Sequence, residues 1–241
     1  MSFIHSPKIV SDQLALYLDA SNINSYSISY TGVWKDLTTY NNPITYGNVR
    51  YNNDGRGYFD FVTATGINSR SDNSSIGFTF NRNMVNTSGN FTFSCWIRDA
   101  VDGGQLGLFS NAAGPDGYRF GPGTNNVYYL VGSGAYYTEG SINYTNPATL
   151  STGVWYNIST VFNRDNSLVS CYINGNYQGS ATLPVGAYQF PLPSNNIPGI
   201  VRSACCSIWS GKLATFSVHN KDLSQAEIIQ NFNALRGRFG V

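Results

Sequence analysis

The stretch DLSQAEIIQNFNALRG, Asp222–Gly237, is the clearest helix pattern in this chain and lies close to its C-terminal end. Ser224 is a favoured N-cap residue, and Glu227 three positions later completes a capping-box pattern. Leu223 before the cap and Ile228 after it have the spacing of a hydrophobic staple. The sequence therefore specifies where this helix begins.

The helix pattern also has one apolar stripe. Ile228, Phe232 and Leu235 follow one another at i, i+4 and i+7, and Gly237 is a natural stop. We expect one α-helix over about residues 224–236. Since a helix of about 12 residues is marginal alone in water, we expect Ile228 and Phe232 to be buried against the rest of the protein.

The segments before the helix have the pattern of β-strands. FTFSCWIR, Phe91–Arg98, alternates with a period of two, which predicts a half-buried strand. Val154–Phe162 and Ser167–Ile173 are two further strand patterns, and Asn174-Gly175 then predicts a tight hairpin turn into Asn176–Thr182. Such patterns recur along the whole chain, so we predict an all-β antiparallel sandwich that forms a single domain over residues 1–241.

Composition excludes several classes of function. Charged residues make up 11% of the 241 residues, the formal net charge is +1, and there is no run of Lys or Arg. A nucleic-acid partner is therefore not expected, because it requires a basic surface. No apolar run reaches the ~20 residues of a membrane span. The start of the chain lacks the pattern of a secretory signal, so we expect folding in a cytoplasm.

Several segments in order resemble one family. They are IVSDQLALYLDASNINSY (Ile9–Tyr26), VWKDLTTYNN (Val33–Asn42), GYFDF (Gly57–Phe61), NFTFSCWIR (Asn90–Arg98), GVWYNISTVFNRDNSLVSCYINGNYQG (Gly153–Gly179) and GKLATFSVHNKDLSQAEIIQNFNALRGRFGV (Gly211–Val241). Together they are similar to concanavalin A-like, laminin-G-like jelly-roll domains, in particular those of virion structural proteins of T4-like marine cyanophages. This resemblance implies a jelly-roll sandwich closed by one C-terminal helix.

The resemblance also implies a function. A non-enzymatic virion structural protein is expected, as a capsid decoration or an exposed fibre or tail-associated module. Its partners would be other virion proteins or copies of itself, with a cell-surface glycan as a further ligand, and its location would be the virion. The chain has four lysines to protect exposed sheet edges, Lys8, Lys35, Lys212 and Lys221, so we expect another subunit to cover an edge or a loop face. A free-standing carbohydrate-binding lectin domain and a glycoside hydrolase stay open as alternatives.

Catalytic residues are scarce. Glycoside hydrolysis generally uses two carboxylates. The chain has only two glutamates, Glu139 and Glu227, the second belongs to the capping box, and no strand pattern carries a cluster of acidic residues. His5 and His219 are the two histidines, and His219 is expected at a strand end. We therefore predict no catalytic residues and no zinc site.

Calcium is the one cofactor that the sequence leaves open. Relatives of the laminin-G and pentraxin type often hold calcium in their loops, and Asp99, Asp102 and Asp116 fall in or near predicted loops. Three carboxylates are fewer than the six to eight oxygen ligands that calcium takes. The alternative is that these aspartates form turns and add solubility, and this alternative is favoured over calcium.

Tyrosines cluster between residues 118 and 144. If the chain has a ligand or partner site, we place it there, because aromatic rings with Asn and Ser nearby suit sugars and protein interfaces alike. The candidate residues are Tyr118, Tyr128, Tyr136, Tyr137 and Tyr144. The alternative is that these rings fill the core of the jelly roll.

Overall fold

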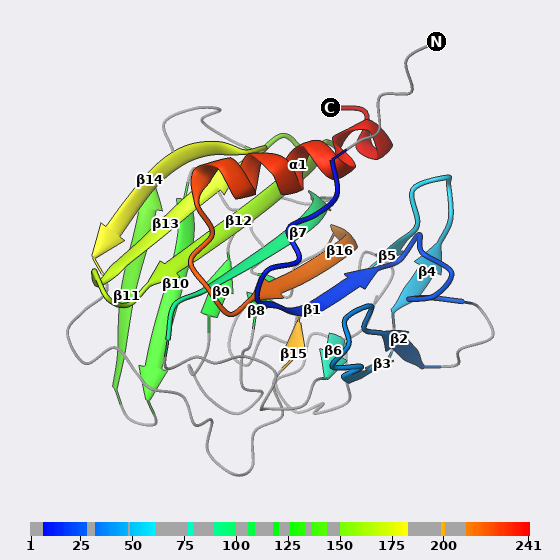
Figure 1. Ribbon diagram of the computed structural model, residues 1–241, viewed down its shortest axis with the longest axis horizontal. Helices are drawn as coiled ribbons and strands as arrows, with labels where there is room; N and C mark the ends of the chain where they lie inside the picture. Colours follow the sequence, from blue (N-terminus) through cyan, green and yellow to red (C-terminus); the bar gives the residue numbers. More distant parts are fainter. Residues whose placement is uncertain are drawn as a thin grey trace.

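The structure is a computed structural model of the chain, shown in Figure 1. It describes residues 7–27, 32–47, 49–60, 77–79, 89–99, 106–108, 118–120, 126–133, 136–143, 150–182, 199–200 and 211–241.

A large antiparallel sheet forms the centre of the molecule. Its strands are β1 (Leu14–Asp19), β4 (Arg50–Asn52), β5 (Tyr58–Asp60), β7 (Phe91–Asp99), β12 (Trp155–Asn163), β13 (Leu168–Ile173), β14 (Asn176–Thr182) and β16 (Gly211–His219). They lie in the order β14-β13-β12-β7-β16-β5-β4, and β1 also pairs with β16. Strand β16, which comes late in the chain, therefore lies in the interior of the sheet, between β7 and β5.

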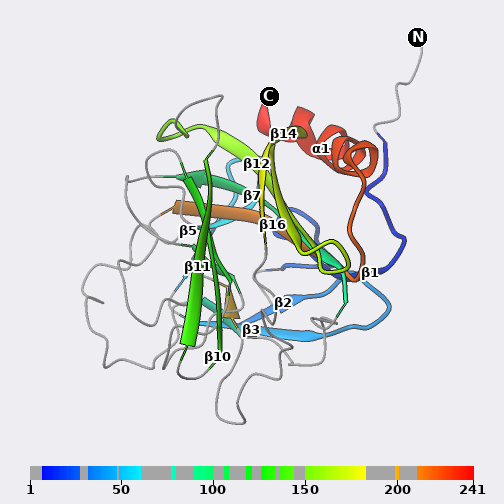
Figure 2. The same cartoon turned by 90° about the vertical axis from the view of Figure 1, so that its left-hand side faces the viewer.

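A second sheet lies across the inner face of the first (Figure 2). Its strands are β2 (Val33–Lys35), β3 (Pro43–Gly47), β6 (Gly77–Thr79), β8 (Leu106–Leu108), β9 (Tyr118–Phe120) and β15 (Gly199–Ile200), in the order β2-β3-β6-β15-β8-β9. Trp34 of β2 and Phe59 of β5 are fully buried, with ring centroids 4.7 Å apart. These contacts between the sheets confirm the predicted sandwich.

The predicted hairpin is present. β13 and β14 pair antiparallel around Asn174 and Gly175, whose φ angles are 51° and 78°. Positive φ at both positions is what a type I′ turn requires, and Asn-Gly tolerates it best. A bulge between Cys171 and Tyr172 shifts the register further along.

Helix α1 (Gln225–Phe239) covers the outer face of the large sheet (Figures 1 and 2). Ser224 is its N-cap and forms the complete capping box with Glu227, as predicted. Leu223 and Ile228 are buried in one apolar cluster, which confirms the staple.

The predicted end of the helix was wrong. Gly237 lies inside the helix, and Gly240 is the cap, with a left-handed φ of 74° and its N–H bonded to the carbonyl of Arg236. The helix continues because Phe239 is buried against Trp96 and Trp155. Phe232 is only partly buried, so Phe239 is the deeper aromatic anchor.

β7 also differs from the prediction of a half-buried strand. Residues Phe91–Ile97 are all buried, on both faces of the strand. The inner face packs in the sandwich, and on the outer face Trp96 is stacked against Phe239, with ring centroids 4.2 Å apart. The final helix therefore covers a face that alternation alone assigns to solvent. No helix in the described part of the chain is long and apolar enough to cross a membrane.

Candidate functional site

The predicted tyrosine site falls largely on a separate hairpin, formed by β10 (Asn126–Ser133) and β11 (Tyr136–Asn143). Tyr128 lies in β10, and Tyr136 and Tyr137 begin β11. Tyr118 begins β9, which lies beside β10, and β11 lies beside β14 (Figure 1). The structure thus brings four of the five candidates into neighbouring strands. Tyr144 lies outside the described residues.

The register of this hairpin divides its residues between two faces, because directly opposite residues share a face and successive residues alternate. One face carries Asn126, Tyr128, Leu130, Gly132, Tyr137, Glu139, Ser141 and Asn143. The other carries Val127, Tyr129, Val131, Ser133, Tyr136, Thr138, Gly140 and Ile142. The first face combines two tyrosines with polar residues, whereas the second is richer in aliphatic residues. Tyr128 and Tyr137 are therefore the stronger candidates for ligand contact.

The carboxylates considered for hydrolysis are in different settings. Glu139 lies in β11 opposite Leu130. The carboxylate of Glu227 accepts from the Ser224 N–H and from Lys221 Nζ, each at 2.8 Å. These contacts lower the pKa of Glu227 to about 2, with the Lys221 bond as the largest cause. Glu227 is thus engaged in starting the helix.

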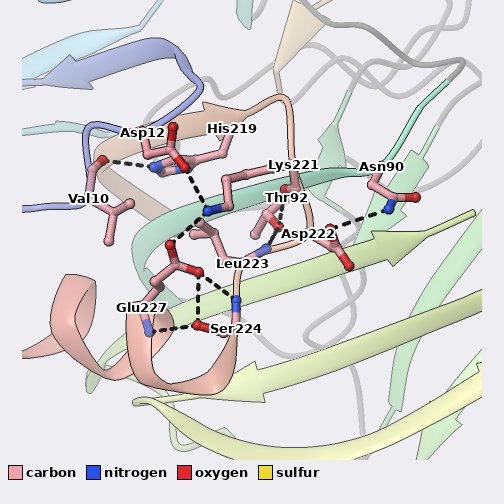
Figure 3. Close-up of polar contacts among 10 residues, drawn as sticks. All are labelled: Val10, Asp12, Asn90, Thr92, His219, Lys221, Asp222, Leu223, Ser224 and Glu227. Carbon is pink, nitrogen blue, oxygen red and sulfur yellow. Dashed lines mark hydrogen bonds and ion pairs between the residues drawn. The ribbon is translucent and has the colours of Figure 1, made fainter.

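Figure 3 shows the polar network at the start of the helix, to which His219 belongs. His219 is fully buried at the end of β16, and its Nε2–H donates to the carbonyl of Val10 at 3.0 Å. Lys221 bridges Asp12 and Glu227, with 2.8 Å to each carboxylate. The hydroxyl of Thr92 in β7 donates to the Lys221 carbonyl and accepts from the Leu223 N–H. The network ties the N-terminal segment, the central sheet and the helix together.

His219 has the features of a structural residue. Burial lowers its pKa below the ordinary value of 6.5, opposed by the Val10 carbonyl, Glu227 and Asp12. Lys221 acts in the same direction as burial. His219 is therefore a buried imidazole that donates to the Val10 carbonyl, which agrees with the expected polar residue at the end of a strand.

We expect the free energy of unfolding to fall as the pH is lowered from about 7.5 to about 5.5, because the unfolded state then binds a proton that folded His219 resists. Because the pKa of folded His219 is depressed, its contribution to the free energy of unfolding is complete above about pH 6.5 and declines below that pH. Urea unfolding at several pH values measures this slope. His219→Gln, which retains an N–H donor, should flatten this dependence on pH. Equal slopes in the parent and His219→Gln would contradict the assignment.

The cysteines of the large sheet are not available as nucleophiles. Cys95 and Cys171 are both free and buried. Burial raises the pKa of Cys95 to about 12 and also raises that of Cys171. Since the thiolate is the reactive form, both act as small apolar core residues.

Two of the three calcium candidates lie outside the described residues. Asp99 ends β7, whereas Asp102 and Asp116 lie outside the described residues. Within the described ranges, no group of three His, Cys, Asp or Glu residues is placed to hold a metal ion. Calcium binding stays a prediction.

The sequence analysis did not identify a row of three residues with hydrogen-bond donor side chains that runs across the large sheet. Trp155 of β12 lies opposite Arg98 of β7, and Arg98 lies opposite Lys212 of β16. These residues are far apart in the chain, and each belongs to an ordinary strand pattern. No local motif points to them, because only the pairing of β12, β7 and β16 makes them neighbours.

Comparisons with known proteins agree with this architecture. A profile described as the concanavalin A-like lectin/glucanases superfamily, of the laminin-G type, matches residues 72–229, which is more than half of the chain. No curated protein is significantly similar to the sequence.

Solved structures with the same fold include receptor-binding domains of botulinum neurotoxins. The binding domain of neurotoxin DC in complex with rat synaptotagmin II is 17% identical with a TM-score of 0.64, over 92% of this chain and 52% of that one. The type G receptor binding domain is 17% identical with a TM-score of 0.62, over 92% and 51%. The domain in a study on entry of neurotoxin type C through two ganglioside molecules is 16% identical with a TM-score of 0.64, over 92% and 51%. The chain spans about half the length of these structures, and such identities show a shared fold alone.

Proposed function

The chain belongs to the concanavalin A-like lectin/glucanases superfamily, and from this premise we propose that it is a non-enzymatic recognition module of a tailed-phage particle. In this proposal it binds neighbouring virion subunits, or copies of itself, and a cell-surface glycan. It is made in the host cytoplasm and resides in the virion. The observation that carries the binding role is the hairpin face with Tyr128 and Tyr137 among Asn, Ser and Glu residues.

The carboxylates support binding rather than hydrolysis. A retaining or inverting glycosidase generally uses two carboxylates on either side of the scissile bond. Of the two glutamates, Glu227 is held by Ser224 and Lys221 at the start of the helix. Glu139 shares its hairpin face with Tyr128 and Tyr137, where a carboxylate suits hydrogen bonding to sugar hydroxyls.

Two further observations support the ligand classes. Related structures carry names that mention gangliosides, SialylT and synaptotagmin, so this fold accommodates glycan and protein partners in other proteins. The phage particle is supported by the resemblance of Gly211–Val241 to virion proteins. In the structure this segment is the central strand β16 followed by helix α1.

We expect the double variant Tyr128→Ala/Tyr137→Ala to lose glycan binding by about tenfold or more while it keeps the parental melting temperature. Two aromatic contacts at roughly 0.5–1.5 kcal/mol each account for a loss of that size. Glycan-array binding and thermal unfolding of the purified protein measure the two quantities.

The matched control is Tyr129→Ala/Tyr136→Ala on the other face of the same hairpin. We expect this variant to lower the melting temperature more than it affects binding. Incorporation of each variant into particles tests the virion role separately. Parental glycan binding by Tyr128→Ala/Tyr137→Ala would remove the hairpin face from the proposal, and glycan binding by a protein absent from particles would favour a free-standing lectin.

A further inference from the structure

The row Trp155–Arg98–Lys212 places two cations side by side on one face of the large sheet. Arg98 and Lys212 are directly opposite one another in adjacent antiparallel strands. Like charges in this position are destabilising. None of the ion pairs formed between described residues includes either cation.

Two polar groups lie next to the cations, the Tyr58 hydroxyl and the Trp155 indole. Lys212 Nζ lies 3.1 Å from the Tyr58 hydroxyl oxygen and 4.5 Å from the centroid of its ring. The indole Nε1–H of Trp155 is buried and has no partner among the described residues. A buried donor without a partner is destabilising, so the Trp155 end of the row lacks an acceptor among the described residues.

The row is not neutral as a whole. Asp60 of β5 lies opposite Lys212 on its other side, and Arg50 of β4 lies opposite Asp60. Counting Arg50, Asp60, Lys212 and Arg98, three positive charges face one negative charge. The excess positive charge lies at the Arg98 end, beside the unpaired indole.

The surroundings of Arg98 leave it partly accessible. Its Nη2 lies 3.6 Å from the position that a Cβ at Gly153 would occupy, so the guanidinium lies beside the turn that leads into β12. Trp155 is packed under Phe239 of the helix, with ring centroids 4.9 Å apart. Arg98 and Lys212 are both partly exposed. The cations are thus accessible to a small group and held by well-packed neighbours.

We propose that Arg98 and Lys212 form a binding site for the carboxylate of an acidic sugar. The planar guanidinium of Arg98 suits bidentate contact with a carboxylate, and Lys212 adds a second positive charge. A sugar is favoured over an acidic protein side chain because the proposed function is glycan binding, and because both cations are only partly exposed, which suits a small group. The proposal rests on the proposed glycan-binding function but uses residues outside the tyrosine hairpin.

Glucuronate and glucose are the probes, since they differ only in the carboxylate at C6. We expect the purified full chain to bind glucuronate at least about tenfold more tightly than glucose, because a charge-assisted hydrogen bond is stronger than one made by a neutral hydroxyl. Titration followed by NMR or calorimetry measures both affinities. Arg98→Gln should abolish the preference at an unchanged melting temperature, and Lys212→Arg should retain it.

Arg50→Gln is the matched control, because it removes the same charge from the same row at an exposed position. It should change glucuronate affinity less than about twofold, as expected for a distant, screened charge. Equal losses in Arg50→Gln and Arg98→Gln would overturn the proposal in favour of general electrostatic attraction. Tight binding of a poly-glutamate peptide without glucuronate binding would overturn it in favour of a protein partner.

The tyrosine variants separate this proposal from the proposed function. Glucuronate binding that is lost in Tyr128→Ala/Tyr137→Ala but kept in Arg98→Gln would overturn the Arg98 site and support the hairpin. Glucuronate binding that is lost in Arg98→Gln but kept in Tyr128→Ala/Tyr137→Ala supports the Arg98 site, even if the hairpin face binds no glycan.

Discussion

Gly57→Ala is expected to lower the free energy of unfolding by about 3 kcal/mol or more, the sum of two separate penalties. Gly57 has a left-handed φ of 64°, which costs a residue with a Cβ roughly 1–2 kcal/mol. A Cβ at this position would also lie 2.7 Å from Ser21 Cα and 2.9 Å from the Ala20 carbonyl carbon. Both atoms are backbone, so no side-chain rotation relieves the overlap, and such overpacking costs roughly 1–3 kcal/mol.

This position matters because three parts of the chain meet there. Arg238, near the end of the helix, donates to the carbonyls of Arg56 and Gly57 at 2.6 and 3.1 Å. It also forms an ion pair with Asp19 at the end of β1, at 2.7 Å. Displacement of Gly57 therefore disturbs the contacts that hold the last turn of the helix.

Gly55→Ala is the matched control, since Gly55 also has a positive φ, of 89°, but an added Cβ meets no atom within 4 Å. We expect this variant to cost only the backbone penalty, roughly 1–2 kcal/mol. Urea unfolding of both variants measures the difference. If the Gly57→Ala variant is as stable as the Gly55→Ala variant, then the Ala20–Ser21 backbone moves away from the added Cβ without loss of stability.

Phe239→Ala is expected to cost about 3–5 kcal/mol, the range for truncation of a buried aromatic residue. The ring of Phe239 is 4% exposed and is stacked on Trp96, with centroids 4.2 Å apart. It also contacts Trp155 at 4.9 Å. Removal of the ring opens a cavity between the helix and the outer face of β7 and β12.

Phe232→Ala provides the comparison. Phe232 is only partly buried, and its centroid lies 5.8 Å from that of Trp96, so its removal should cost less. Denaturant midpoints at unchanged m-values measure both effects. A larger loss of unfolding free energy in Phe232→Ala than in Phe239→Ala would show that the stripe expected from the sequence, and not Phe239, is the main anchor of the helix.

The candidate site was only partly predictable. The sequence located four tyrosines that the structure places in neighbouring strands. Strand alternation puts Tyr136 and Tyr137 on opposite faces, but only the register of β10 and β11 shows which residues share each of these faces. Arg98 and Lys212 were not predicted at all, since they become neighbours only when β7 pairs with β16.

The sequence by itself determined the features that depend on residues a few positions apart. The capping box of Ser224 and Glu227, the staple of Leu223 and Ile228, and the Asn174-Gly175 turn all formed as predicted. Their free energies come from local hydrogen bonds, contacts within a helix turn and backbone φ preferences, which short motifs specify.

Only the tertiary structure decided where the helix ends and which strand faces are buried. Gly237 is a local stop pattern, yet the helix continues to Phe239 because that ring is buried against Trp96 and Trp155 from distant strands. The outer face of β7 alternates like a solvent-exposed face, yet it is buried because the helix packs on it. In both cases the burial of aromatic surface, worth about 1.5–3 kcal/mol per side chain, outweighs a local preference of about 1 kcal/mol.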